Sequence, residues 1–392
     1  MLRFLTAGES HGKSLTAIIE GIPAKLGLGE KDINKELTRR QSGYGRGRRM
    51  QIEKDTAEIT SGVRHGKTLG SPITMIIKNR DWQNWKNIMS IEPAGKNSAQ
   101  AVTHPRPGHA DLAGLLKYGF SDARNIIERA SARETAARVA LGAVSKKLLG
   151  EFKIKVYSRT VQIGSVKCTD EFHPSPASIK LIESSKVRCL CKDSTKKMIA
   201  LIDEARDKGD TLGGIFEIVV TNVPVGLGSH VDASLKLDGR LAQGLMSIQS
   251  VKGVEVGLGF EAARRFGSLV HDRILYQKGS SANKGNRFFH KTNNAGGIEG
   301  GISNGESITL RVAVKPISTL MDPLQSVDIV TKKAVKATVE RSDVCVVPAA
   351  GVVGEAVVAF EIARAMKEKF GADSVDEMKT NFMNYIESVK GR

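Results

Sequence analysis

Apolar residues recur every three or four positions in several parts of the chain, which is the spacing of a buried helix face. The clearest case is 132–149, where Ser131 and Glu134 also have the spacing of a capping box at a helix start. Another periodic stretch stops at Gly371, a residue typical of helix ends. Together these patterns predict helices over 32–39, 132–149, 353–370 and 375–389.

Strand-like apolar runs lie between these helices. They occupy 1–6, 15–22, 51–61, 72–79, 152–166, 212–223 and 307–316. Strands and helices alternate irregularly, without regular βαβ spacing or a G-x-G-x-x-G turn, so a doubly wound nucleotide-binding fold is disfavoured. Because there is no Pro/Ser-rich linker and no repeat, the pattern indicates one α+β domain over residues 1–392.

The composition is that of a globular protein. Of 392 residues, 40% are hydrophobic and 26% are charged, and no apolar run approaches the roughly 18 residues of a membrane helix. The first residues lack the apolar stretch and cleavage site of a signal peptide, so we expect a cytoplasmic protein. Four irregularly spaced cysteines and eight histidines without ligand spacing indicate reduced thiols and no metal site.

A formal net charge of +17 indicates anionic partners. One interpretation is a nucleic-acid-binding protein, and the other is an enzyme that acts on a small, highly charged substrate. Aromatic residues make up only 5% of the chain, which argues against stacking platforms for single strands. The lysines are scattered, whereas arginines crowd one glycine-punctuated stretch at Arg39, Arg40, Arg46, Arg48 and Arg49.

Residues 293–305 contain two Gly-Gly pairs and end on a further glycine. Glycine in regular structure costs roughly 0.5–1 kcal/mol relative to alanine, so this density favours backbone that turns sharply or approaches a ligand. A flexible surface loop and a ligand cradle are both consistent with the run alone.

Two short motifs contain histidines suited to proton transfer. Residues 8–12 place His11 between glycines in a turn between two predicted strands, where it would be accessible. Residues 104–111 combine two histidines with Arg106 and two stiffening prolines, so they could bind an anionic group and protonate it. Taken singly, each motif could equally be a surface turn.

Other polar segments could bind anions or a cofactor. Arg129, Ala130 and Ser131 precede the predicted helix, whose free amides and dipole favour a phosphate there, and Arg133 could add charge-assisted hydrogen bonds. Residues 238–253 read as an amphipathic helix that runs into a loop at Gln249-Ser250. Pro316 would end a strand and leave the polar residues of 315–319 available to a ligand.

Taken together, these segments resemble the chorismate synthase family. The match covers nearly the whole chain in order, over Gly8–Gly12, Gln41–Met50, His104–Asp111, Arg129–Gly142, Gly209–Gly214, Leu245–Phe260, 293–305 and Arg341–Gly351. The resemblance implies a β-α-β sandwich in which helices pack between mostly antiparallel sheets, assembled as a homotetramer. It also implies reduced FMN as cofactor and 5-enolpyruvylshikimate 3-phosphate as substrate, from which phosphate is eliminated in 1,4 fashion with a C6 hydrogen and no net redox change.

The resemblance assigns roles residue by residue. His109 would be the general acid near the departing phosphate, and His11 would manage charge on the reduced flavin. Asp343 would help the flavin N5 to accept the C6 proton. Ser10 and Ser131 would support these groups. FMN-binding positions would be Arg129, Ala130, Ser131, Gln249, Ser250, Gly300, Lys315, Pro316, Ile317, Ser318, Thr319 and Arg341. Arg40 and Arg46 match NADP positions, whereas Arg46, Arg49, Arg106 and Arg133 could clamp the substrate.

The chain departs from the family pattern in three places. Ala130 stands where many members carry serine, and Gln249-Ser250 where many carry Asn-Ala, so side-chain hydrogen bonds to flavin would differ there. Residues 268–292 match poorly and are expected to form a loop. A flavin reductase using the same cofactor is a further alternative, and NADPH or an external reductant could each reduce the FMN. If Gly300 approaches FMN closely, Gly300→Val should block flavin binding and leave the fold intact.

Overall fold

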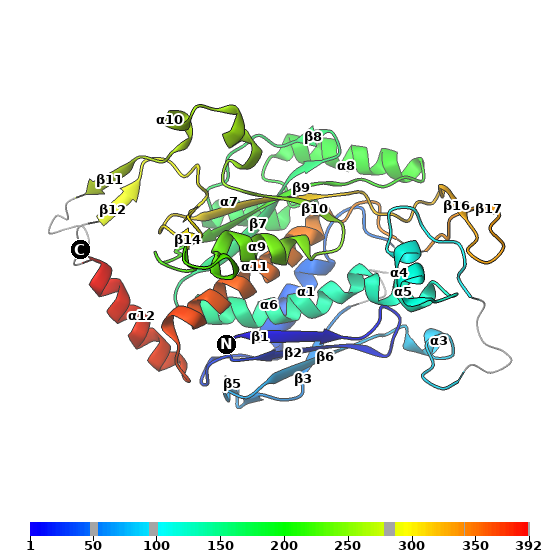
Figure 1. The fold of residues 1–392 in the computed structure, drawn as a ribbon, viewed down its shortest axis with the longest axis horizontal. Helices are drawn as coiled ribbons and strands as arrows, with labels where there is room; N and C mark the ends of the chain where they lie inside the picture. The colour runs from blue at the N-terminus through cyan, green and yellow to red at the C-terminus, as the bar shows by residue number, and fades with distance from the viewer. Residues whose placement is uncertain (48–53, 94–100, 278–286, 341, 391–392) are drawn as a thin grey trace.

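Two antiparallel sheets and the helices beside them form the framework of the chain (Figure 1). The computed structural model describes residues 1–47, 54–93, 101–277, 287–340 and 342–390. The first sheet has the strand order β1-β2-β6-β3, formed by β1 (Arg3–Ala7), β2 (Ser14–Glu20), β6 (Ile73–Lys78) and β3 (Ala57–Ile59). Alternate residues of β2 and β6 are buried, so one face of this sheet packs on the core.

The second sheet has the order β10-β15-β9-β7-β8, and all its neighbouring strands are antiparallel. Its strands are β10 (Val251–Val256), β15 (Ile308–Val314), β9 (Gly214–Thr221), β7 (Lys155–Ile163) and β8 (Val166–Lys167). Phe216, Ile218 and Val220 alternate along β9 and are fully buried. This alternation places one face of the second sheet on the core as well.

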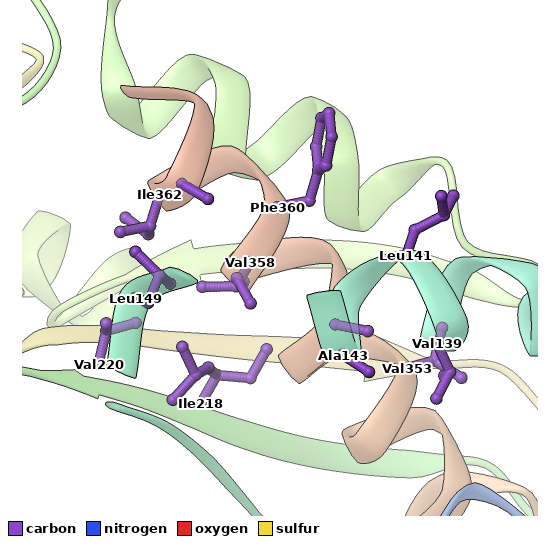
Figure 2. Packing of buried hydrophobic residues seen from close by; sticks show 14 of the residues in the cluster. Val139, Leu141, Ala143, Leu149, Ile218, Val220, Val353, Val358, Phe360 and Ile362 are labelled. Carbon is purple, nitrogen blue, oxygen red and sulfur yellow. The ribbon is translucent and has the colours of Figure 1, made fainter. Parts of the chain in front are cut away.

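Two long helices connect the sheets. α6 (Thr135–Gly150) packs against β2, α11 (Val347–Phe370) packs against β7 and β9, and the two helices pack against each other. A Cβ atom at Gly142 would lie 2.2 Å from that of Ala356, so the helices approach this closely only because residue 142 is glycine. Figure 2 shows the resulting core, with Val139, Leu141, Ala143 and Leu149 of α6, Val353, Val358, Phe360 and Ile362 of α11, and Ile218 and Val220 of β9.

A cluster of buried charges joins α11 to its neighbours, and the sequence patterns did not reveal it. Glu355 is fully buried and accepts hydrogen bonds from Arg39 (2.7 Å), Lys146 (2.6 Å) and Ser158 (2.6 Å). Arg188 also contacts it at 3.2 Å. Burial alone would raise the pKa of Glu355, but the surrounding cations hold the pKa well below its usual value. Arg39 lies on α1 (Glu30–Gln41), so the cluster fixes the helix that also carries Arg40.

The remaining elements are short helices, turns and hairpins around this framework. They are β4 (Val63–Arg64), β5 (Lys67–Thr68), α3 (Trp82–Trp85), α4 (Asp111–Tyr118), α5 (Arg124–Ala130), the 3-10 turn η1 (Ala132–Glu134), α7 (Pro176–Ser184), α8 (Lys192–Asp207), η2 (Ala233–Leu235), α9 (Leu237–Met246), η3 (Gly259–Arg264), α10 (Gly267–Val270), β11 (Ile274–Gln277), β12 (Arg287–His290), β13 (Ile298–Glu299), β14 (Ile302–Ser303), β16 (Gln325–Val327), β17 (Ala334–Lys336) and α12 (Val375–Lys390). Within the described ranges, no helix has the length and apolar character needed to cross a membrane.

The α+β class is confirmed, and several local predictions need correction. Residues 268–292 are not a plain loop, because they contain most of α10 and the β11–β12 pair. The helix expected to run into a loop at Gln249-Ser250 is α9, which ends at Met246, and β10 begins directly after this loop, at Val251. Ser131 does cap the next turn, but Glu134 accepts from Thr6 and Arg138, so the expected capping box is not formed and α6 begins at Thr135. The four cysteines are free thiols, as expected.

Candidate active site

A cavity of about 420 Å³ opens where several separate chain segments meet. This volume lies within the roughly 300–1,000 Å³ of small-molecule sites. It is lined by most of the predicted site residues, namely Ser10, His11, Arg40, Arg46, Arg106, His109, Ala130, Ser131, Arg133, Gln249, Ser250, Lys315, Ile317, Ser318, Thr319 and Asp343. Pro316, Arg129 and Gly300 do not line it. Arg49 and Arg341 lie outside the described residues.

His11 is held rigidly on the loop between β1 and β2. Its ring Nδ1 lies 2.9 and 3.0 Å from the two carboxylate oxygens of Glu128, and its backbone N–H donates to the same carboxylate at 2.8 Å. The ring stacks on Trp85 with centroids 3.6 Å apart. His11 lines the cavity, where a ligand can reach it, but it does not face open solvent, because only 12% of its side chain is exposed.

The carboxylate beside His11 is ionised. Burial would raise the pKa of Glu128, but hydrogen bonds and charge from His11, with a further hydrogen bond from Arg124, outweigh burial and lower the pKa. Arg124 in turn binds Glu340 at 3.1 Å, and Glu340 also lines the cavity. His11 thus stands at the end of a chain of charged groups on and beside α5.

His109 has a similar partner. Its Nδ1 makes a short contact with Asp111, which is fully buried and also accepts from Arg106 at 2.8 Å through Nε and at 3.0 Å through the backbone N–H. Although burial opposes it, these partners hold the pKa of Asp111 well below its usual value. His104, the other histidine of this motif, pairs with Asp328 at 3.1 Å and does not line the cavity. Only His109 of the two is therefore a candidate for chemistry.

One wall of the cavity carries two arginines that share a buried acid. Asp55 accepts from Arg133 at 2.5 Å and lies 3.5 Å from Arg40. Arg40 also donates to Thr135 Oγ1 and to the carbonyl of Ala132. Because one carboxylate draws both guanidinium groups to the same place, this wall is suited to an anionic ligand.

Arg46 and Asp343 form a second charged pair at the cavity. They lie 3.1 Å apart, and the backbone N–H of Gly47 donates to Asp343 at 2.6 Å. The Nε atom of Arg46 is buried without a hydrogen-bond partner among the described residues. Asp343 therefore pairs with Arg46 rather than standing alone, and Arg46 retains a donor that a ligand could satisfy.

The polar side chains of segment 315–319, which the sequence predicts to be free for a ligand, form hydrogen bonds with the His109 motif. Lys315 Nζ and Ser318 Oγ both donate to the carbonyl of Gly108, and Thr319 Oγ1 accepts from Arg106 at 2.9 Å. Burial and the charge of Lys252 lower the pKa of Lys315. Nearby, the buried Oε1 of Gln249 lacks a hydrogen-bond partner in the described structure. Gln249 therefore offers a bound molecule a buried hydrogen-bond acceptor in this part of the cavity wall.

Two expected FMN positions lie elsewhere. The Arg129 guanidinium donates to the carbonyls of Thr6 (2.8 Å) and Gly8 (2.9 Å), so it anchors the His11 loop. Gly300 lines a second cavity of about 320 Å³, beside η3, α10 and Asp272. A Cβ atom there would meet no protein atom within 4 Å, so valine would not clash with the chain itself. Valine would instead be strained by the backbone, whose φ is +60°.

Comparison with known proteins decides the family. The chorismate synthase family model matches residues 2–366. The chain belongs to the chorismate synthase family. A chorismate synthase of Aquifex aeolicus (strain VF5) is 56% identical over 397 residues, which cover 99% of this chain and 98% of that protein. One of Pelobacter propionicus (strain DSM 2379 / NBRC 103807 / OttBd1) is 57% identical over 395 residues and the full length of both. A crystal structure of a chorismate synthase superposes with a TM-score of 0.79 at 46% identity, covering 100% of this chain and 99% of the other.

Sequence reasoning missed several cavity residues of this chorismate synthase family member. Glu340 lines the cavity, and Glu128 and Asp55 are hydrogen-bonded to the lining residues His11 and Arg133. Each of these acids pairs with a residue far along the chain, so the sequence alone did not mark it. Trp85 gave one usable signal, since the chain has only two tryptophans and both lie within residues 82–85. The apolar part of the wall was not predicted either, and it consists of Ile127, Ile248, Val346, Ala349 and Val353.

Proposed function

We propose that the 420 Å³ cavity is the site where this chain, a lyase of aromatic amino-acid biosynthesis, converts 5-enolpyruvylshikimate 3-phosphate to chorismate with the help of reduced FMN. One observation carries the proposal. The cavity brings two carboxylate-paired histidines together with four arginines from separate segments, at Arg40, Arg46, Arg106 and Arg133. This set suits an anionic substrate from which a proton and a phosphate must be removed.

The residues present fit a flavin. The unpartnered Oε1 of Gln249 could accept from a ring N–H, while Ile127, Ile248 and Ile317 provide apolar surface. Ser131 and Ala130 lie at the junction of α5 and η1, where backbone amides could reach a phosphate. When bound, reduced FMN supplies electron density to the substrate without net redox change. The departures at Ala130 and Gln249-Ser250 therefore leave a usable site.

The arginines would bind the substrate. It carries two carboxylates and a phosphate, and planar guanidinium groups bind such groups in bidentate fashion. Arg106 and Arg133 are each held on one edge by a buried carboxylate, which fixes their direction before the substrate arrives. We assign Arg46, Arg106 and Arg133 to the substrate and keep Arg40 with Arg46 as candidate NADP positions. Arg49 and Arg341 stay in the proposal on the family resemblance alone.

His109 would move the proton to the departing phosphate. Its Nδ1 faces Asp111, so the proton it donates is the one on Nε2. His11 would likewise exchange a proton through its ring, but with the reduced flavin. Asp343, oriented by Arg46 and Gly47, would help the flavin N5 to accept the C6 proton. Ser10 and Ser131 would support these residues from the cavity wall.

The assembly and location follow from the same proposal. We infer a cytoplasmic homotetramer of single-domain chains. The packing of α6 and α11 between the two sheets supports a layered β-α-β sandwich for each chain. Exposed apolar residues near the second cavity, including Phe260, Phe266 and Leu269, support contact between subunits. In such a tetramer, a neighbouring subunit rather than its own chain would bring Gly300 to FMN. Since the clustered arginines line a cavity, we expect no nucleic-acid partner.

An anaerobic assay tests the reaction. The purified protein, chemically reduced FMN and 5-enolpyruvylshikimate 3-phosphate should give chorismate and phosphate in equal amounts while the flavin remains reduced. Replacing the chemical reductant by NADPH then shows whether the chain reduces its own flavin. Steady NADPH oxidation without chorismate would identify a flavin reductase and contradict the proposal.

A further inference from the structure

Glu128 contacts both the ring and the backbone of the His11 loop, as a residue that orients His11 would. Its carboxylate lies against the ring Nδ1 (2.9 and 3.0 Å) and accepts from the backbone N–H of His11 (2.8 Å). Its own carbonyl accepts from the N–H of Ser10 at 2.9 Å. The Glu128 side chain is only 2% exposed, so water does not compete for these bonds.

We propose that Glu128 and Trp85 are positioning residues for His11: they fix its tautomer and its ring plane, so that His11 exchanges protons with the cavity through Nε2. The proposal rests on the function assigned above to His11. Nothing in the family resemblance or in the motifs gave either residue a role.

The tautomer follows from hydrogen-bond chemistry. An ionised carboxylate accepts hydrogen bonds and cannot donate them, so Nδ1 must carry a hydrogen whether the ring is neutral or charged. Nε2 is then the nitrogen that gains or loses a proton. Histidines that bind metals are oriented by the same arrangement, in which a carboxylate holds the second ring nitrogen.

Trp85 fixes the ring plane. Its indole stacks on His11 with an interplanar angle of 23°, and its Nε1 donates to Asp81 Oδ2 at 3.1 Å, which anchors the indole. The guanidinium of Arg124 lies 5.4 Å from the indole centroid and also contacts Glu128 at 3.3 Å. Arg124 therefore touches both positioning residues. With the plane and one nitrogen fixed, the direction of Nε2 is determined.

Activity in a double-mutant cycle tests the proposal. Glu128→Leu should lower kcat by about 10- to 100-fold, the range seen when the carboxylate partner of a ligating histidine is removed. Glu128→Gln should lose less, because its amide oxygen can still accept from Nδ1. In a His11→Ala background neither change should lower kcat further, since no ring remains to be positioned. An equal loss in both backgrounds would show a purely structural role and overturn the proposal.

The neighbouring tryptophan provides a matched control. Trp82 lies on the same short helix α3, but it does not line the cavity. Trp85→Leu should lower kcat and leave the His11→Ala variant unaffected, whereas Trp82→Leu should leave kcat unchanged. Equal losses from the two tryptophan variants would assign the effect to folding of α3 and contradict the role given to Trp85.

A measurement without flavin or substrate gives the second readout. In the protein with ¹⁵N-labelled histidine, the nitrogen shifts of His11, assigned by comparison with His11→Ala, should show the hydrogen of the neutral ring on Nδ1. In Glu128→Leu it should move to Nε2. A wild-type ring with its hydrogen on Nε2 would overturn the proposal. Full activity of His11→Ala would instead remove His11 from the proposed function, and the shifts would still decide whether Glu128 sets the tautomer.

Discussion

At the scale of single residues, the two histidines of the 104–111 motif have different surroundings and should behave differently on substitution. His109→Ala should lower kcat by roughly 10²-fold or more, as expected for loss of a general acid, while FMN still binds. His104→Ala is the matched control, because His104 pairs with Asp328 outside the cavity. His104→Ala should therefore keep a kcat close to that of the wild type. Measuring kcat and FMN affinity for both variants checks the prediction. If His109→Ala turned over at the wild-type rate, His109 would have no part in proton transfer.

The sequence predicted residue types well and their partners poorly. His11, His109 and the four arginines of the cavity were all identified, because their polar motifs stood out from the apolar pattern around them. Asp111 lies in the same motif as His109 and Arg106, but the other partners are distant in sequence: Glu128 lies 117 residues from His11, and Asp55 lies 78 residues from Arg133. Hydrogen bonds of this kind depend on how the elements pack. The sequence likewise gave no sign that the Arg129 side chain supports the His11 loop.

At the scale of elements, the charge cluster around Glu355 should hold α1, α6, α11 and β7 together. Glu355→Gln should lower the free energy of unfolding at pH 7 by about 3–5 kcal/mol, because it leaves buried cations without their carboxylate. The pKa of Glu355 is lowered in the folded state, so its stabilisation is complete above the ordinary value of 4.5 and is lost as pH falls below it. Denaturant unfolding at pH 7 and at acid pH should therefore show a smaller difference between variant and wild type in acid.

Glu361 on the same helix is the control for this experiment. Burial raises its pKa, so the ionised form is unfavourable in the folded state at pH 7. Glu361→Gln should be neutral or stabilising at pH 7, in contrast to Glu355→Gln. Equal destabilisation by both variants would mean that amides are poorly tolerated in α11, and that the cation cluster has no special role.

Long periodic elements were the most predictable part of the fold. α6, α11 and α12 follow the apolar spacing closely. α11 begins at Val347, earlier than the predicted 353. Its first turns consist of small residues and a proline, so the apolar spacing did not reveal them. The β11–β12 pair was missed because its apolar residues are exposed and alternate with no buried face. α8 was missed because the lysines of its first turns obscured its apolar face, and α7 was missed because it is short, with only Ile182 buried.

At the scale of the whole molecule, the exposed apolar side chains beside the second cavity predict association. Light scattering should give about four times the chain mass of 42.3 kDa. Phe266 is 83% exposed, so Phe266→Glu should cost little in the isolated chain and reduce assembly. If a neighbouring subunit brings Gly300 to FMN, the same variant should also weaken FMN binding. A monomeric wild-type protein would contradict the proposed assembly.

The class of fold and the family could be inferred from the order of the motifs, whereas the relation between the two cavities could not. The glycine run of 293–305 lies by the second cavity and away from the histidines, although in sequence it looked like part of one site.

The central claim is that one cavity holds FMN and substrate together, and a fluorescence titration tests it most directly. FMN should be titrated with the protein in the absence and in the presence of 5-enolpyruvylshikimate 3-phosphate. Because the two ligands would contact the same walls, we expect tighter FMN binding and stronger quenching when substrate is present. Quenching that does not depend on the substrate would contradict a shared site.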